Sequence, residues 1–229
     1  MSASAPLLRL DRVAKFYGPK LVFKGVSLAL AAGEVLLVAG ANGAGKSTLL
    51  KVMAGLARPS AGSVRCAAEP ERTAYLGHAT FLYAGLTARA NLRFWARMYG
   101  LPGDESSVDA ALARVGLTAA AEERAGTFSR GMAQRLNLAR VFLVGPRLVY
   151  LDEPSTGLDV ASRRVLTREL AALKASGASI VWVSHHMAED AALADRVLEL
   201  AGGRAAWLGP TAEYPGLASA VPAGAEAAC

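Results

Sequence analysis

One glycine-rich run of eight residues limits the folds open to this chain more than any other feature of its sequence. The run is Gly40-Ala-Asn-Gly-Ala-Gly-Lys-Ser47, and it matches the pattern G-x-x-x-x-G-K-S/T. Glycines let successive backbone N–H groups face inward as a nest for an anion, and a helix that starts near Lys46 adds the partial positive charge of its N-terminus. The run therefore predicts a phosphate cradle between a strand and a helix.

Each part of this cradle has an expected role. Lys46 would reach the β- and γ-phosphates of a nucleotide, and the hydroxyl of Ser47 would bind Mg²⁺. The backbone of the loop would surround the phosphates. The predicted nucleotide-binding residues are Gly40, Ala41, Asn42, Gly43, Ala44, Gly45, Lys46, Ser47 and Thr48.

Three short apolar runs indicate the fold class. Val35–Val38, Leu148–Leu151 and Ile180–Val183 are continuous and rich in apolar residues, as strands buried on both faces of a parallel sheet are. Helical patterns separate these runs, at Ser47–Leu56, Met132–Leu143 and Ala161–Lys174. Strands that alternate with helices predict an α/β fold with a mainly parallel sheet.

The remaining segments predict two additions to this sheet. Leu7–Leu30 alternates roughly as half-buried antiparallel strands do, and the Ala-, Leu- and Arg-rich middle, about Ala84–Val144, is typical of helices interrupted at Gly100–Gly103. We therefore predict one domain over 1–217, with a core at about 1–77 and 146–217. An N-terminal antiparallel β subdomain belongs to this core, a helical subdomain is inserted at about 78–145, and 218–229 form a flexible tail.

Polar residues follow each of the three apolar runs. The cradle follows the first, Asp152 and Glu153 follow the second, and His185 follows the third. Because ligands bind at the carboxyl ends of parallel strands, we expect these groups to converge on one triphosphate. Asp152 would hold the Mg²⁺ shell, and Glu153 would orient or deprotonate the attacking water. His185 would bond the γ-phosphate or help to place Glu153.

Composition excludes several classes of protein. Of the 229 residues, 53% are hydrophobic and 19% are charged, a balance that excludes wholesale disorder. No apolar run approaches the roughly 18 residues that span a bilayer. The first residues lack the basic stretch and long apolar core of a signal peptide. We therefore expect a soluble cytoplasmic protein, with any membrane role supplied by a partner.

Charge and cysteine content add two further expectations. The net charge is +6, but the 25 Lys and Arg residues are scattered without a basic run, so we expect no nucleic-acid partner. Cys66 and Cys229 lie far apart and fit neither a disulfide framework nor a zinc pattern.

With these motifs in order, the chain resembles the ATP-binding cassette family. That family carries an L-S-G-G-Q segment after its helical subdomain, and the matching stretch here is Phe128-Ser129-Arg130-Gly131-Met132. Ser155-Thr-Gly-Leu-Asp159 looks like the family's D-loop, and Ser184-His185 looks like its switch histidine. Tyr17 looks like the aromatic residue that stacks on adenine. The resemblance runs from about Leu8 to Pro210, which is most of the chain.

The resemblance implies a P-loop NTPase core that binds ATP with Mg²⁺ and hydrolyses it. Ser129 and Gly131 would contact the phosphate held by the cradle of a second copy, in a head-to-tail dimer with two-fold symmetry. Asp159 would belong to the same nucleotide site. The resemblance also implies an integral membrane transporter subunit as partner, with this chain lying peripherally on the cytoplasmic face of the inner membrane.

Three residues depart from the family's pattern. His78 stands where the family usually has a Gln that touches Mg²⁺ or its water, so His78 is a candidate metal contact. Arg130 replaces the first Gly of the signature segment, and Met132 replaces its Gln. Arg130 adds positive charge near the expected γ-phosphate contacts.

A shorter match points to one subfamily. Tyr75-Leu-Gly-His78, followed by Leu86-Thr-Ala-Arg-Ala-Asn91-Leu, looks like the ATP-binding subunit of the haem exporter of cytochrome c biogenesis, with Ala90 in place of a Glu. Between these stretches lie Phe81, Leu82 and Tyr83. They would either dock a membrane subunit or pack inside the helical subdomain.

Three functions are compatible with this reasoning. The first is an ATPase subunit of a transporter, of the haem-exporter type or of another export system. The second is a cassette ATPase that acts on nucleic acid or ribosomes, which the short span from Thr48 to Ser129, without sustained heptads, disfavours. The third is a clamp that binds ATP without hydrolysing it, which Glu153 and His185 disfavour.

Overall fold

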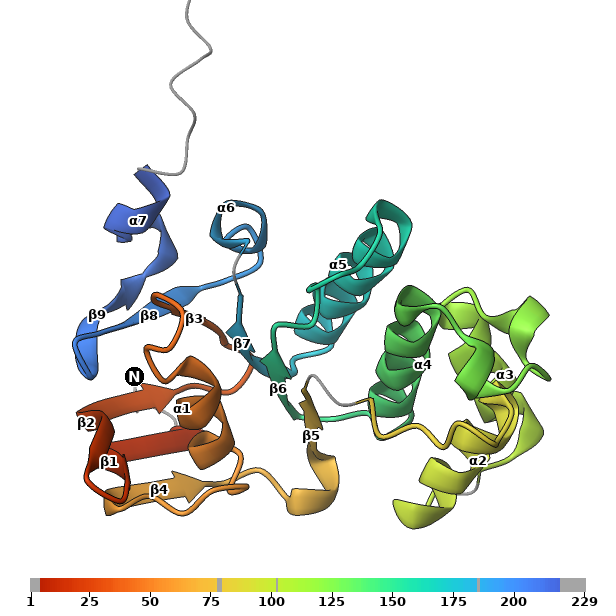
Figure 1. The fold of residues 1–229 in the computed structure, drawn as a ribbon, viewed down its shortest axis with the longest axis horizontal. Coiled ribbons are helices and arrows are strands. Elements are labelled where there is room, and N and C mark those ends of the chain that lie inside the picture. Colours follow the sequence, from red (N-terminus) through yellow and green to blue (C-terminus); the bar gives the residue numbers. More distant parts are fainter. Residues whose placement is uncertain (1–4, 78–79, 102, 185, 219–229) are drawn as a thin grey trace, which may run out of the picture. The chain divides into compact units, whose positions relative to one another are not determined.

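The computed structural model describes residues 5–77, 80–101, 103–184 and 186–218 of the chain, and its ribbon is drawn in Figure 1. The fold is α/β, with mainly parallel strand pairing and a separate three-stranded antiparallel sheet. The chain forms two compact units. The first joins Met1–Ala67 to Val181–Cys229, and the second is Ala68–Ile180.

The N-terminal antiparallel sheet of the first unit contains β1 (Leu8–Tyr17), β2 (Lys20–Leu30) and β4 (Ala61–Cys66), in the order β2-β1-β4. Leu8 pairs with Leu30 across the β1–β2 ladder, and both are fully buried. The alternation seen in the sequence therefore sets which face of this sheet is covered, and the predicted antiparallel β subdomain is confirmed.

The first unit also holds the strand that leads into the cradle. β3 (Val35–Ala39) is buried at every residue and pairs in parallel with β8 (Arg196–Ala201), which pairs antiparallel with β9 (Arg204–Pro210). The Val181–Val183 part of β7 (Ser179–Val183) flanks β3 on its other side. Continuous apolar sequence thus corresponds to strands covered on both faces. The α-helices described in this unit are α1 (Lys46–Met53), α6 (Met187–Asp190) and α7 (Pro215–Ala218).

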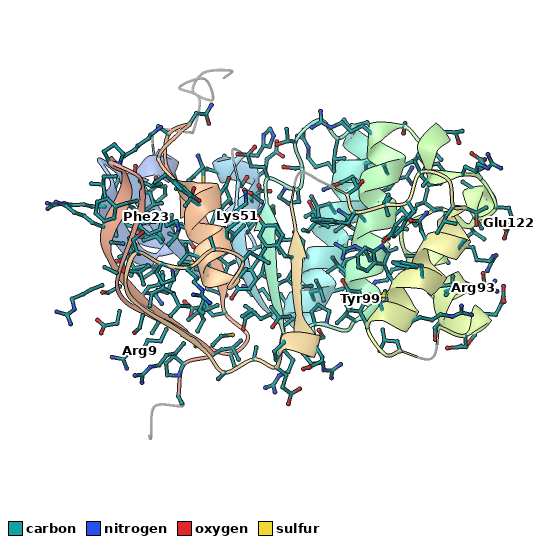
Figure 2. All side chains as sticks on the ribbon, turned by 60° about the horizontal axis from the view of Figure 1, so that its bottom comes forward. Arg9, Phe23, Lys51, Arg93, Tyr99 and Glu122 are labelled. Carbon is teal, nitrogen blue, oxygen red and sulfur yellow. The ribbon has the colours of Figure 1, made fainter. Side chains whose placement is uncertain are left out.

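A buried side chain of β2 lies close to the glycine that precedes α1. Phe23, on β2, is fully buried and lies on the side of the sheet toward the start of α1 (Figure 2). Helix α1 ends at Met53, three residues before the predicted end, because Gly55 adopts a left-handed conformation with φ of 71°.

The second unit combines a strand pair with helices. β5 (Thr73–Leu76) pairs in parallel with β6 (Leu148–Asp152), and β6 is buried at every residue. The helices of this unit are α2 (Ala88–Met98), α3 (Glu105–Arg114), α4 (Arg130–Leu143) and α5 (Val160–Ala175). Helices α2, α3 and α4 pack against one another, as Figure 1 shows, and α4 also packs against α5 and β5.

Side-chain caps fix where these four helices begin. Thr87, Asp104, Ser129 and Asp159 each accept a hydrogen bond from the backbone N–H three residues ahead, at the start of α2, α3, α4 and α5. The cap at Ser129 starts α4 two residues before the predicted position. The predicted interruption at Gly100–Gly103 lies between α2 and α3. None of the described helices combines the length and apolar character needed to cross a bilayer.

Candidate functional site

The predicted cradle adopts a backbone that only glycine tolerates well. Gly40, Gly43 and Gly45 have φ values of 136°, 79° and 99°. A Cβ atom on Gly40 would collide with the carbonyl oxygen of Leu200, and one on Gly45 would lie 2.7 Å from Cγ1 of Val22. The loop therefore follows a narrow path between β8 and β2.

Lys46 is the first residue of α1 and only 5% exposed. Its ammonium donates hydrogen bonds to the carbonyl oxygens of Gly40 (2.8 Å) and Ala41 (3.0 Å). The first turn of α1 contains no acidic residue, so the positive end of this helix keeps its charge. A left-handed glycine loop, a held ammonium and a helix N-terminus together form a donor set that fits a polyphosphate.

Tyr17 lies in the same unit, at the end of β1, and is 55% exposed. The ammonium of Lys15 lies 4.8 Å from the centroid of its ring. An exposed aromatic face is what stacking on a flat heterocycle needs.

Asp152 ends β6 and is 2% exposed. The hydroxyl of Tyr75, on β5, donates to Oδ2 of Asp152 at 3.1 Å. Burial raises the pKa of Tyr75 well above its ordinary value, and the nearby charge of Asp152 raises it further. The phenol therefore remains a donor that orients this carboxylate, as partners of metal-ligating carboxylates do.

Glu153 has a strained backbone. Its φ is 53°, in the left-handed region that non-glycine residues rarely adopt. Thr156 Oγ1 lies 3.4 Å from Oε2 of Glu153, within reach of a long hydrogen bond. Glu153 also lines a hollow in the second unit together with Gly77, Thr80, Arg130, Gln134 and Thr156. Backbone strain beside a lined hollow favours a functional role for this carboxylate.

The donor set of the acids suits Mg²⁺ better than a metal that needs a full protein cage. Among the described residues, no group of three or more His, Cys, Asp or Glu side chains is arranged to hold a metal ion. Mg²⁺ commonly takes one or two carboxylates and completes its shell with phosphates and water. Asp152 and the hydroxyl of Ser47 therefore remain the predicted ligands of such an ion.

The signature segment begins α4. Ser129 is exposed, and its Oγ accepts a hydrogen bond from the N–H of Met132 at 3.2 Å. Gly131 is buried, and a Cβ on it would lie 2.8 Å from Oγ of Ser162. The glycine thus lets α4 approach the start of α5 closely, a packing role that the sequence did not reveal. The phosphate contacts assigned to Ser129 and Gly131 remain predictions.

The substitution at Arg130 has a visible consequence. Its guanidinium lies over Gly157, where an added Cβ would come within 2.5 Å of one guanidinium nitrogen. Asp159, in the same turn, caps α5 by accepting from the N–H of Ser162 at 2.6 Å, and this hydrogen bond lowers the pKa of the carboxyl. Its contact with a nucleotide remains a prediction.

Two predicted site residues, His78 and His185, lie outside the described residues. The cradle belongs to the first compact unit and the acids belong to the second. The predicted convergence of Lys46, Asp152 and Glu153 on one triphosphate therefore remains a prediction.

Sequence reasoning also missed residues that surround the acids. Tyr75 was noted only as part of a subfamily match, although a tyrosine on a short strand beside β6 is suited to contact Asp152. Gln134 donates to the carbonyl of Pro154 at 3.2 Å and so ties α4 to the turn after Glu153. Gln134 lies one turn into α4, and this position in the sequence could have indicated such a contact.

Comparison with known proteins adds independent information. The family described as "ABC transporter" matches residues 23–156 of the chain. The chain is 40% identical over 196 residues to the cytochrome c biogenesis ATP-binding export protein CcmA of Rhodobacter capsulatus, covering 85% of this chain and 87% of that protein.

A second relative is the linearmycin resistance ATP-binding protein LnrL of Bacillus subtilis, which is 35% identical over 202 residues. The match covers 83% of this chain, which spans only 65% of the length of that relative. Among solved structures, one described as an ATP-binding subunit of an ABC transporter superposes with a TM-score of 0.81 at 29% identity. That match covers 89% of this chain and 90% of the other.

Proposed function

Because the chain belongs to the ABC transporter family and is an ATP-hydrolysing nucleotide-binding subunit, we propose that it drives an exporter of the type used in cytochrome c biogenesis. The observation that carries this proposal is the glycine cradle closed around Lys46, whose ammonium is held by the loop's own carbonyls. The 40% identity to CcmA over most of both chains supports the subfamily.

The first unit binds the nucleotide in this proposal. The backbone N–H groups of the cradle and the start of α1 receive the phosphates, and the Lys46 ammonium turns from its two carbonyls to the β- and γ-phosphates. Tyr17 presents its ring to the adenine. These groups lower the barrier by positioning the phosphates and stabilising their charge, not by covalent chemistry.

The acids of the second unit complete the site. When bound, Mg²⁺ would be held by Ser47 and Asp152 and would neutralise charge on the phosphates. The hydroxyl of Tyr75 keeps the carboxylate of Asp152 oriented. Glu153 accepts a proton from the attacking water or orients it, and His185 assists it. His78 is a further candidate contact of the Mg²⁺ shell.

A second copy of the chain completes each nucleotide site. Ser129 of the partner would approach the γ-phosphate, and the positive end of α4 would add to the charge there. Two nucleotides would thus be held between two chains in a head-to-tail dimer. Dimer closure on ATP and opening after hydrolysis would supply the motion that drives transport.

An aromatic patch on the second unit is the proposed contact with the membrane subunit. The patch consists of Phe81, Tyr83, Phe94, Trp95 and Tyr99. The rings of the last four contact one another with centroids 4.6–6.4 Å apart, and Phe81 is joined to them by a hydrogen bond from Nε1 of Trp95 to its carbonyl oxygen. Phe81 and Tyr83 are 54% and 47% exposed, which favours docking over internal packing. An apolar helical segment of the membrane subunit is the occupant we propose.

The loop that carries Phe81 and Tyr83 is held by a buried asparagine. Asn91 is fully buried, accepts from the N–H of Tyr83 at 2.8 Å and donates to the carbonyl oxygens of Tyr83, Leu86 and Thr87. A loop whose backbone is fixed in this way presents its aromatic side chains with a reduced ordering cost on binding. In this proposal the chain lies peripherally on the cytoplasmic face of the cell membrane.

The proposed head-to-tail dimer can be tested with a chain that binds ATP but hydrolyses it slowly. Glu153→Gln should become a dimer when MgATP is added, so its mass by light scattering should double. The same variant carrying Lys46→Ala should remain monomeric, because the cradle then lacks its ammonium. A Glu153→Gln chain that binds ATP and stays monomeric would contradict the proposed dimer.

The membrane partner and the cargo need separate tests. A membrane protein encoded beside this chain should co-purify with it, and Phe81→Asn with Tyr83→Ser should lose that partner; Asn tolerates the positive φ of 52° at position 81. Deletion of the gene should abolish haem-bearing c-type cytochromes. The match to LnrL favours a second candidate, an antibiotic exporter. In that case deletion should sensitise cells to linearmycin and leave the cytochromes intact.

A further inference from the structure

Arg140, on α4, is a buried cation whose hydrogen-bond partners within the described part of the chain are all uncharged. It is 4% exposed, and no carboxylate among the described residues pairs with its guanidinium. Its N–H groups donate to the hydroxyl of Tyr99 (2.7 Å), to Oδ1 of Asn137 (2.9 Å) and to the carbonyl oxygen of Tyr75 (3.3 Å). Burying an unpaired charge lowers stability, so its presence indicates a role that a neutral side chain would not fill.

The guanidinium of Arg140 contacts two rings of the aromatic patch. It lies 4.9 Å from the ring centroid of Trp95 and 5.8 Å from that of Phe81, within the range of cation–π attraction. Trp95 in turn donates from Nε1 to the carbonyl oxygen of Phe81 at 3.0 Å. Tyr99, labelled in Figure 2, completes the contact between α2 and Arg140. Displacement of the patch therefore acts directly on this side chain.

Tyr75 joins Arg140 to the acid at the end of β6. Its backbone carbonyl accepts from Arg140, and its hydroxyl donates to Asp152 at 3.1 Å. Both contacts are made by one residue on the four-residue strand β5. A continuous set of hydrogen bonds and ring contacts thus runs from the patch to Asp152, entirely within the second unit.

We propose that Arg140 and Tyr75 are positioning residues that couple the aromatic patch to Asp152. The inference rests on the proposed function, in which the patch contacts the membrane subunit and Asp152 belongs to the Mg²⁺ site. A partner helix that presses on Phe81 or Trp95 shifts the guanidinium, and with it the strand that carries the phenol donor. Coupling between two sites is reciprocal, so nucleotide binding also alters the surroundings of Trp95.

This reciprocity allows a test without the partner. Tryptophan emission is measured while MgATP is added to the full chain carrying Glu153→Gln, and again with Trp95→Phe added. The difference between the two is the Trp95 response. We expect a clear response that falls by at least three-quarters in Tyr75→Phe and in Arg140→Lys. The Mg²⁺ concentration for half-maximal response of the remaining tryptophans should rise about tenfold in Tyr75→Phe.

Two substitutions of the same kind serve as controls. Arg114 also makes a cation–π contact, with Phe142 at 4.3 Å, and an ion pair with Glu169, but it contacts neither Tyr75 nor Trp95. Arg114→Lys should keep the full Trp95 response. Tyr214→Phe removes a hydroxyl that faces Glu199 and should likewise keep it. Melting temperatures show which variants are folded, and Tyr99→Phe replaces Arg140→Lys if the latter is not.

Displacement of a fluorescent nucleotide measures ATP binding separately in every variant. A Trp95 response that survives in Tyr75→Phe and Arg140→Lys, or that is absent from the parent chain while ATP is bound, would overturn the coupling and leave the proposed function standing. Absence of ATP binding in the parent chain would contradict the proposed function itself, and the inference with it.

Discussion

The close packing around the glycines of the cradle can be tested by substituting one of them with alanine. Gly40→Ala places a Cβ against the carbonyl oxygen of Leu200 on a backbone with φ of 136°. We expect the free energy of unfolding to fall by about 2–4 kcal/mol, since both overpacking and backbone strain oppose the change. Gly85→Ala is the matched control, because nothing lies within 4 Å of an added Cβ there. Urea denaturation measures both, and equal stability of the two variants would be inconsistent with this geometry.

The strained backbone of Glu153 gives a second prediction at this scale. Asn tolerates a positive φ better than other non-glycine residues do. Glu153→Asn should therefore be more stable than Glu153→Ala by about 1 kcal/mol, because only the alanine variant keeps the full strain at φ 53°. Thermal unfolding of the two inactive variants makes the comparison. A more stable alanine variant would show that the backbone at this position is relaxed.

At the residue scale, the sequence predicted those site residues that belong to a motif with a known chemical role. The spacing of residues within these motifs indicates a chemical role for each member, so the sequence was sufficient to propose Lys46, Asp152 and Glu153. Tyr75 and Arg140 carry no such motif. Their importance depends on which strand lies beside β6 and which helix packs on β5, and neither pairing is encoded by local spacing.

Among the helices, α3 tests how capping sets an element boundary. Asp104 caps this helix, and hydrogen bonds from Ser106 and Ser107 lower the pKa of its carboxyl from 3.8 to about 2. A lowered folded pKa means that the stabilisation is fully present above pH 3.8 and is lost as the pH falls through about 2. Asp104→Asn keeps a cap that does not titrate.

The melting temperature of the wild-type chain should therefore approach that of Asp104→Asn as the pH is lowered from 5 toward 2. Ser107→Ala removes one of the donors to Asp104. In chains that carry it, the melting temperatures with Asp and with Asn at position 104 should already lie closer together at pH 5. A difference between wild type and Asp104→Asn that does not change with pH would show that the charge on Asp104 is not what stabilises the start of α3.

Elements with a strong local pattern were predictable, and those without one were not. β3, β6 and β7 are buried at every residue and, apart from Asp152 and Ser179 at their ends, apolar, so continuous hydrophobicity identified them. β4 was missed because none of its six residues is buried. β5 has only four residues, and its identity as a strand depends on pairing with β6.

At the scale of the whole molecule, the parts of the proposed site come from two compact units and from two copies of the chain. Lys46 belongs to one unit, and Asp152 and Glu153 belong to the other. No local sequence pattern predicts how residues from separate units and separate chains are placed relative to one another. Their order along the chain, shared with the ABC transporter family over residues 23–156, is what supports a common nucleotide site.

Hydrolysis of MgATP by single and double variants tests this central claim most directly. Lys46→Ala and Glu153→Gln should each lower kcat by at least about 100-fold. If both residues act on the same triphosphate, the double variant should be little slower than the slower single variant, because groups that work as a unit are not additive. Phosphate release at saturating MgATP measures all four chains. A Glu153→Gln chain that hydrolyses ATP at the wild-type rate, or losses that multiply fully in the double variant, would contradict the account.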